Sequence, residues 1–376
     1  MSAVSEHHAR VVIQSDPPIV LPVISQEITM DVESIPYVSA TIVCPLGDGA
    51  VLALDPQAAD VWADIQVRRV MGRIDRIADL TLRYRGQTLA AITAQFAAKT
   101  VAAITRSLYH DYETPGVARR EEARTFHLML RGFAVDEKAA TVTLSFASGE
   151  ARLEDDAHVG TTPVEIAGAN LAAKVRTVLA RSGFTLIAAP TSTPAATAMG
   201  DEKMWTPGAT AWEAVHAMVR KHDLILWCDE TGAFRLASTR DSATVRTLTS
   251  SGPARTVTDA RWTRSRDQGW TTAVMLTYTW NGTTTYDVAT TPGAPIRLHT
   301  ERIEKPYPGA GRAASKLRAL RARGSALDLD AVSAYTINPG EQVRFTGPAA
   351  AHQGRLTTVS WRFPEDEMSL RMREVN

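Results

Sequence analysis

Residues 124–147 read RTFHLMLRGFAVDEKAATVTLSFA. On both sides of the central VDEKAA, every second position carries an apolar side chain: Phe126, Leu128, Leu130, Val142, Leu144 and Phe146. A period of two places alternate side chains on one face of a strand. The polar connection between the two runs has the length of a hairpin loop. The stretch therefore predicts two antiparallel strands that share one buried face.

The same alternation recurs through the first third of the chain. Three further runs show it: Ile28, Met30 and Val32; Val38, Ala40, Ile42 and Cys44; Val61, Ala63, Ile65 and Val67. Five alternating strands in about 150 residues are typical of an antiparallel barrel or sandwich. We assign residues 1–152 to an N-terminal β-barrel domain.

A repeat with a period of twelve lies inside this domain, at residues 76–111. Its units read RIADLTLRYRGQ, TLAAITAQFAAK and TVAAITRSLYHD. The apolar spacing suits helical turns. A step of twelve is about 3.33 turns, however, so one long helix would rotate each unit by roughly a third of a turn. Short helices and repeated loops both fit, and we interpret the repeat as an insertion on the barrel.

The pattern changes after Glu150. A helix is expected over 163–182, opening at Pro163 and ended by Gly183. A second helix is expected in TAWEAVHAMVRKH, and LILWCDETGAFRLA follows as two strands joined at an Asp-Glu-Thr-Gly turn. We therefore predict that residues 153–240 form a small α/β domain of helices and a hairpin.

From about residue 255 the pattern returns to β. Val274, Leu276 and Tyr278 alternate on one face, and Asn281-Gly282 is a strong signal for a two-residue hairpin turn. We assign residues 241–306 to a second antiparallel β-barrel domain.

The last part of the chain combines one helix with strands. Leu317 and Leu320 lie on the apolar face of a helix predicted at 310–323, and Gly324 would end it. Alternating runs follow, and we expect residues 307–376 to pack on the earlier domains. The predicted fold class is mainly β with α+β parts: two barrels, a helix-and-hairpin domain and a C-terminal β segment.

The composition of the chain narrows the range of functions to be considered. The 376 residues include 41 basic and 41 acidic side chains, so the net charge is zero. Proteins that grip nucleic acid usually carry a basic excess. No apolar run approaches the roughly 18 residues of a membrane span, and the N-terminal residues show no secretory signal. We expect a multi-domain chain without membrane insertion.

Two groups of side chains could hold a metal ion in principle. Glu213 and His216 lie three apart on a predicted helix, with His222 and Asp223 beyond, but bundles that bind metals this way need the motif twice. The second group, at the end of the first domain, is Glu154, Asp155, Asp156 and His158. Acidic turns arise for ordinary reasons of solvation and capping. We assign no metal-binding and no cofactor-binding residue.

Candidates for catalysis are equally sparse. His110, Asp111 and Glu113 follow the repeat, but no activated nucleophile lies near them in sequence. Cys44 and Cys228 lie on apolar strands and are interpreted as buried small hydrophobes. The chain contains no nucleophile elbow, zinc-protease, phosphate-loop or dinucleotide motif. We assign no catalytic residue and expect a protein that is not an enzyme.

The predicted helix at 310–323 is strongly basic and contains no acidic residue. Its cations are Arg312, Lys316, Arg318, Arg321 and Arg323. Such a helix can face nucleic acid or an acidic partner surface. The pattern is also that of a helix whose apolar stripe is buried and whose cations are solvated, and the neutral total favours this second interpretation.

The order of these pieces resembles the tail hub proteins of long-tailed bacteriophages, often called minor tail proteins in phages of actinobacteria. The resemblance covers roughly residues 27–373. The stretches that carry it are EITMDVESIPYVSATIVCPL with LALDP, the repeats at 88–105, the pair at 124–153, GATAWEAVHAMVRKHDLILWCDETGAFRL, and NPGEQVRF with HQGRLTTVSWRFPEDEMSLRMRE. Each pattern alone has low specificity, and their colinear order carries the identification.

The resemblance implies a structural role in the virion. Hub proteins of this family form a trimer at the tail tip, and each subunit supplies two tail-tube-like barrels, so the ring is pseudo-sixfold. The implied partners are the tail tube or a distal tail protein above and a central fibre, spike or tape-measure protein in the lumen. DNA only passes through. The implied location is the virion tail tip, after assembly in the host cytoplasm. The alternatives are another tail-tip component, such as a distal ring or receptor-binding protein, and a cell-wall hydrolase.

Overall fold

The computed structural model describes residues 4–47, 54–72, 120–188, 204–222, 224–238, 242–251, 256–266, 270–304, 306–307 and 309–374. The described chain is mainly β with α+β parts, and this confirms the predicted fold class. The repeats at 76–111 lie outside the described residues. None of the described helices combines the length and the apolar character that crossing a bilayer requires.

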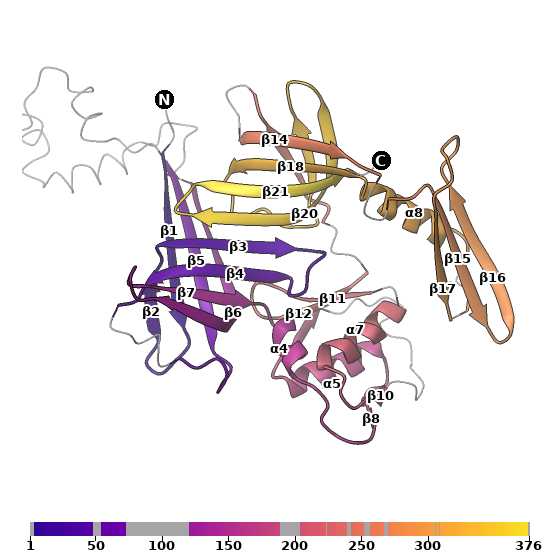
Figure 1. Cartoon of the computed structure of the whole chain (residues 1–376), viewed down its shortest axis with the longest axis horizontal. Helices are drawn as coiled ribbons and strands as arrows, with labels where there is room; N and C mark the ends of the chain where they lie inside the picture. Colours follow the sequence, from indigo (N-terminus) through magenta and orange to yellow (C-terminus); the bar gives the residue numbers. More distant parts are fainter. Residues whose placement is uncertain are drawn as a thin grey trace, which may run out of the picture.

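Most strands belong to one large sheet of thirteen strands. Its N-terminal block holds β1 (Val4–Ile13), β2 (Ile19–Pro22), β3 (Ser25–Asp31), β4 (Val38–Pro45), β5 (Trp62–Gly72), β6 (Arg120–Asp136) and β7 (Thr141–Ala147). Its C-terminal block holds β13 (Val245–Thr249), β14 (Val257–Arg264), β18 (Ser325–Val332), β19 (Gln342–Thr346), β20 (Ala351–Phe363) and β21 (Glu367–Glu374). Figure 1 shows the two blocks side by side, the first in indigo and purple and the second mostly in yellow.

The N-terminal block curls on itself. Its strand order is β3-β4-β7-β6-β5-β1-β2, and β2 leads after two residues into β3, so the chain returns to the strand at the other end of the order. The predicted hairpin of 124–147 is present as β6 and β7, with Val135 opposite Val142. Phe126, Leu128 and Leu144 are fully buried, as alternation requires.

Strand β20 joins the two blocks. Its first residues pair with β19, most of its length pairs with β21, and Thr358–Phe363 pairs antiparallel with β3. The apolar residues of both blocks consequently form one core cluster, in which Trp361 of β20 lies 5.9 Å from Phe126 of β6 between ring centroids. Burial of large aromatic side chains across the junction stabilises the joined sheet.

A separate α/β unit, residues 150–238, lies beside the N-terminal block (Figure 1). It contains α4 (Glu150–Asp155), β8 (Val164–Glu165), α5 (Leu171–Arg181), β9 (Leu186–Ala188), β10 (Met204–Trp205), α7 (Ala211–Lys221), β11 (Ile225–Cys228) and β12 (Phe234–Ala237). Its own core includes Leu171, Val175, Val215 and Phe234. The predicted second helix and the hairpin after it are present as α7 and the β11–β12 pair.

The helix predicted over 163–182 begins eight residues later. Asn170 is its N-cap, because its side chain accepts a 2.9 Å hydrogen bond from the backbone N–H of Ala173. Pro163 precedes the short strand β8, which pairs with β10, and Gly168 follows with a φ of 146°. A residue with that φ cannot belong to a right-handed helix. The proline was therefore a misleading start signal.

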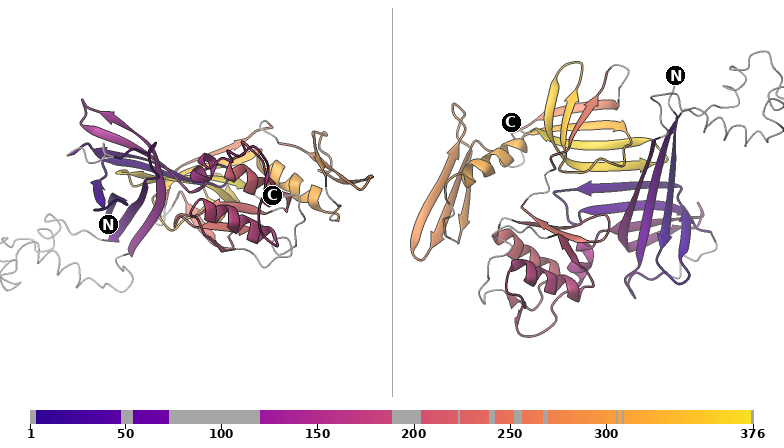
Figure 2. Two further views of the ribbon diagram at one scale, coloured as in Figure 1. Left: turned by 90° about the horizontal axis from the view of Figure 1, so that it is seen from below. Right: turned by 180° about the vertical axis from the view of Figure 1, so that it is seen from behind.

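The remaining elements form an arm, residues 270–323. It consists of β15 (Ala273–Trp280), β16 (Thr283–Thr290), β17 (Leu298–Ile303) and α8 (Arg312–Ala322). The predicted turn is present: Asn281 and Gly282 have φ of 48° and 75°. Both views of Figure 2 show the arm standing away from the rest of the chain.

The strand pairing divides this region differently from the expected blocks 241–306 and 307–376. Strands β13 and β14 pair with β19 and β18, so they belong to the large sheet together with the C-terminal strands. The arm is inserted between β14 and β18. Sequence spacing could not reveal this, because alternation identifies a strand but not its distant partner.

Candidate functional site

The first candidate group predicted from the sequence lies on and directly after α7. Its described side chains take part in local contacts of this helix. The carboxylate of Glu213 accepts a 2.9 Å hydrogen bond from the backbone N–H of Thr210, whose hydroxyl accepts one of 3.1 Å from the N–H of Glu213. This is a capping box. His216 stacks on Trp212 at 5.1 Å between centroids. His222 is the C-cap residue, and Asp223 lies outside the described residues.

The second group, Glu154, Asp155, Asp156 and His158, lies on and directly after α4. Its carboxylates point to different partners: Asp155 pairs with Arg131, while Asp156 accepts a 2.8 Å hydrogen bond from Ser182. His158 is buried, and its Nε2 lies 2.9 Å from the carbonyl oxygen of Thr162. Burial raises the pKa of Glu154. Asp155, Asp156 and His158 thus make separate local contacts on and after α4 rather than one shared site.

The two cysteines are buried. Burial raises the pKa of the Cys44 thiol to about 11, and burial together with the Glu150 carboxylate raises that of Cys228. Both thiols are therefore protonated at neutral pH and poor nucleophiles. The third candidate group, His110, Asp111 and Glu113, lies outside the described residues. Within the described ranges, no three histidine, cysteine or acidic side chains come together as a possible metal site.

A joint of largely buried basic side chains ties the two β blocks together. Arg124 of β6 donates to the carbonyl oxygens of Tyr335 and Ile337 at 3.1 Å each, and to the side-chain oxygen of Asn338 at 2.6 Å. Its guanidinium also lies 5.2 Å from the ring centroid of Trp361. One planar side chain with five donors therefore ties β6 to a loop of the C-terminal block.

A second set of contacts reinforces the same joint. Arg69 of β5 lies 3.2 Å from Asp366 and donates to the carbonyl of Ser333. His7 of β1 approaches Asp366 at 2.9 Å and the hydroxyl of Tyr335 at 3.3 Å. Burial raises the pKa of Tyr335, which stays protonated. Sequence patterns did not identify this joint, because its partners are more than 200 residues apart.

The arm presents an uncovered sheet face. One face of its sheet packs against α8 through Val274, Leu276, Tyr278, Ala313, Leu317 and Leu320. The opposite face carries Met275 beside Val288 and Thr277 beside Tyr286, according to the strand register. Tyr286 is 60% exposed and Val288 56%. An apolar sheet face that nothing else in the described chain covers has the character of an interaction surface.

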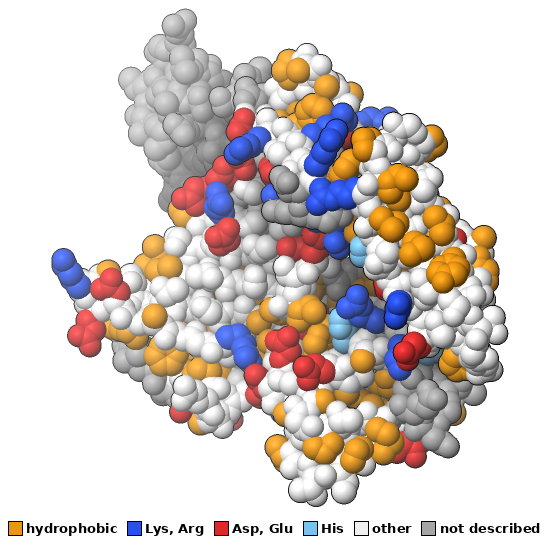
Figure 3. Space-filling view, turned by 45° about the vertical axis from the view of Figure 1, so that its right-hand side comes forward, with side chains coloured by type: hydrophobic (Ala, Val, Ile, Leu, Met, Phe, Trp, Pro, Cys, Tyr) orange, Lys and Arg blue, Asp and Glu red, His pale blue; other side chains and the backbone are white. Residues whose placement is uncertain are grey.

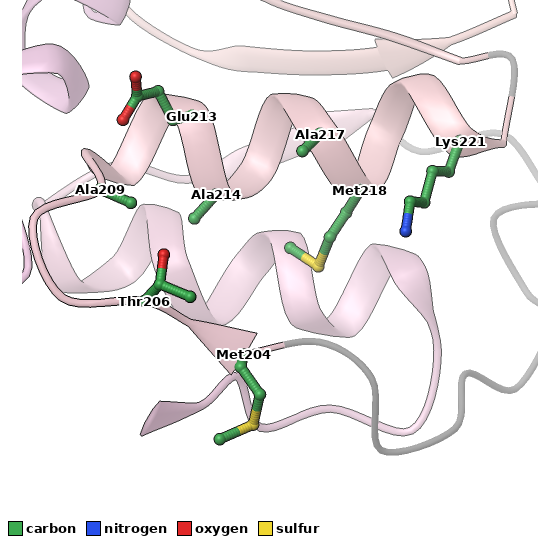
Figure 4. A pocket seen from close by; sticks show the side chains of 8 residues that line it. All are labelled: Met204, Thr206, Ala209, Glu213, Ala214, Ala217, Met218 and Lys221. Carbon is green, nitrogen blue, oxygen red and sulfur yellow. The ribbon is translucent and has the colours of Figure 1, made fainter. Parts of the chain in front are cut away.

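A shallow groove of about 300 Å³ runs along α7 in the α/β unit (Figure 4). Ala214, Ala217 and Met218 line its middle, Glu213 and Lys221 lie toward the two ends of the helix, and Met204 approaches from β10. Met204 is 41% exposed. The groove offers an apolar floor between charged ends.

The basic side chains of the predicted helix at 310–323 differ in their surroundings. In α8, Lys316 pairs with Glu301 of β17 at 3.1 Å, whereas Arg318 and Arg323 are exposed. The apolar stripe of Ala313, Leu317 and Leu320 is buried as predicted. The helix is thus built as the sequence indicated, and its exposed cations lie on the arm rather than on the large sheet.

The sequence matches no protein-family model and no curated protein sequence. Solved structures do share its fold. The tail protein from Neisseria meningitidis MC58 superposes with a TM-score of 0.62 at 13% identity, covering 98% of this chain and 97% of that one. The 43 kDa tail protein of prophage MuSo2 from Shewanella oneidensis gives 0.55 at 11% identity, with 97% and 98% covered.

A third structure extends the likeness. The prophage tail protein gp18 from Listeria monocytogenes EGD-e superposes with a TM-score of 0.53 at 7% identity, covering 97% of this chain and 94% of that one. The chain therefore has the fold of phage tail proteins along nearly its whole length.

Proposed function

We propose that the chain is a structural tail hub protein of a bacteriophage virion. Three copies form a pseudo-sixfold ring at the tail tip, which joins the hexameric tail tube to the central fibre, spike or tip and lets DNA pass. The observation that carries the proposal is the end-to-end fold likeness to the tail proteins of Neisseria and prophage MuSo2, with 97% or more of both chains covered.

The construction of the molecule supports this role. Each chain supplies two β blocks joined edge to edge at β20 and β3, so three chains would present six blocks around an axis. The buried joint at Arg124 and Arg69 fixes the angle between the blocks, which a ring of constant diameter needs. The neutral net charge suits a channel that conducts DNA without retaining it.

The proposal can be tested with the purified chain. Light scattering should give a mass of about 122 kDa, three times the 40.8 kDa chain, and negative-stain images of the same peak should show rings with a central hole. A closed dimer, or a chain that cleaves cell-wall material, would contradict the proposal. A hydrolysis assay on isolated cell walls of a bacterial host provides the second readout.

A further inference from the structure

The arm concentrates exposed apolar side chains. Of the large hydrophobic residues that are well exposed in the described chain, six belong to residues 270–323: Trp280, Tyr286, Val288, Ile296, Leu298 and Tyr307. Figure 3, in which this side of the molecule is brought forward, shows hydrophobic side chains set among uncharged ones toward its right-hand edge. By the strand register, three of them, Tyr286, Val288 and Leu298, lie together on the outer sheet face, and an exposed apolar patch of this kind has the character of an interaction surface.

The arm also carries a charge that the rest of the chain balances. Residues 270–323 contain eight basic and three acidic side chains, a net charge of +5. Because the total is zero, the remaining residues carry −5. The α/β unit contributes to this negative charge, with eleven acidic and eight basic side chains in residues 150–238, a net charge of −3.

This separation of charge decides between two ways of pairing. Five of the eight cations of the arm belong to residues 312–323, on or directly after α8 and therefore behind the outer sheet face. Two arms that met by their outer faces would still bring two net charges of +5 close together, and like charges oppose association. An arm that meets the acidic part of another copy gains attraction instead. A contact between two different surfaces of identical chains is heterologous, and such contacts form a ring when the rotation from one copy to the next closes.

We propose that the outer sheet face of the arm docks on the α/β unit of a neighbouring copy. The docking face comprises Met275, Tyr286, Val288 and Leu298. The receiving surface carries the exposed acid Glu154, the exposed ion pair of Asp155 with Arg131, and the apolar groove along α7, beside which Met204 is exposed. The inference rests on the proposed ring and names the contact that closes it.

The test uses the full-length chain and three measurements. The double variant Tyr286→Glu, Val288→Glu places two carboxylates on the docking face, and its association constant should fall about tenfold or more by analytical ultracentrifugation. The matched control is Val135→Glu, which adds a carboxylate at an exposed apolar position of β6 away from the arm. Its association should equal that of the wild type. Circular dichroism checks that each variant is folded.

A photo-reactive phenylalanine analogue at position 286 locates the contact. Cross-links to peptides of residues 204–221 in another copy are expected, and cross-links from arm to arm would overturn the inference. Association should also weaken as salt is added, because opposite charges meet. An association that salt strengthens would contradict the charge argument.

The outcomes separate this inference from the proposed function. A trimeric ring that persists in the double variant overturns the arm contact and leaves the hub proposal in place. A wild-type chain that stays monomeric at its highest soluble concentration overturns the arm as a self-association surface. A closed two-fold dimer contradicts both.

Discussion

Arg124 illustrates how single residues set the geometry of this protein. Its side chain is 8% exposed, and its guanidinium also lies 3.2 Å from Glu230 and donates to three oxygen atoms of the loop at 335–338. Removing a buried charged donor leaves those acceptors without a partner. The substitution Arg124→Met should therefore lower the free energy of unfolding by about 3 kcal/mol, measured by urea denaturation.

The control for this prediction is Arg362→Met. Arg362 is 45% exposed and pairs with Glu27 and Glu367 at 3.6 and 3.4 Å. Exposed ion pairs contribute little, so the change should be about 0.5 kcal/mol or less. Equal losses in the two variants would contradict the role assigned to the joint.

Asp229 gives the stability a dependence on pH. Burial alone would raise the pKa of its carboxyl group, but hydrogen bonds from Thr231 and Arg235 outweigh burial and hold that pKa below its usual value. A lowered folded-state pKa stabilises the fold above the unfolded value of about 3.9. That stabilisation is lost as the pH falls through the folded-state pKa.

The expected result for Asp229→Asn is a flatter acid profile. The wild type should lose stability steeply as the pH falls below about 4, and the variant should lose less over the same range, since its amide does not titrate. Urea midpoints at a series of pH values measure both profiles. The exposed Asp259→Asn serves as control and should follow the wild type. Identical slopes in all three proteins would refute the assignment.

At the scale of elements, β20 is central to the large sheet because it pairs with three other strands. Gly354 lies within it, and a Cβ added there would meet the carbonyl oxygen of Arg373 at 2.2 Å. The backbone of β21 cannot yield without breaking pairs. Gly354→Ala should therefore destabilise the fold by about 2 kcal/mol, seen as a lower melting temperature.

Gly132 of β6 is the matched glycine. A Cβ added at Gly132 meets no atom within 4 Å. Gly132→Ala should leave the melting temperature near that of the wild type. If both variants melted alike, the close approach of β20 and β21 at Gly354 would not limit stability.

Local chemistry explains which elements the sequence could predict. The Asn281-Gly282 turn and the capping box of Thr210 and Glu213 involve neighbours in sequence, so the β15–β16 hairpin and α7 were predicted correctly. The predicted start of α5 was wrong because Asn170 competes with Pro163 as a start signal. The partners of β13 and β14 lie about 60 to 100 residues away, and no local pattern encodes them.

For the candidate site, prediction from sequence reached the arm's basic helix but not its exposed sheet face. Tyr286 and Val288 alternate with neighbours like any half-buried strand, and only the position of α8 shows which face is covered. The joint at Arg124 could not be predicted from the sequence either. Arg124 donates to backbone carbonyl oxygens, and these give no sequence pattern because every residue has one. The likeness to tail proteins was predicted from the order of the elements along the chain and not from any single motif.

At the scale of the whole molecule, the account depends on one geometric idea. Two β blocks tied by a buried joint, and an arm whose charge is opposite to that of the remaining chain, are the features from which we propose a closed ring of identical subunits. A three-dimensional electron-microscopy reconstruction of the assembled chain tests this most directly. The account predicts a threefold ring in which the two β blocks of each subunit alternate around a central channel. An assembly with two-fold symmetry, or one without a channel between the blocks, would contradict it.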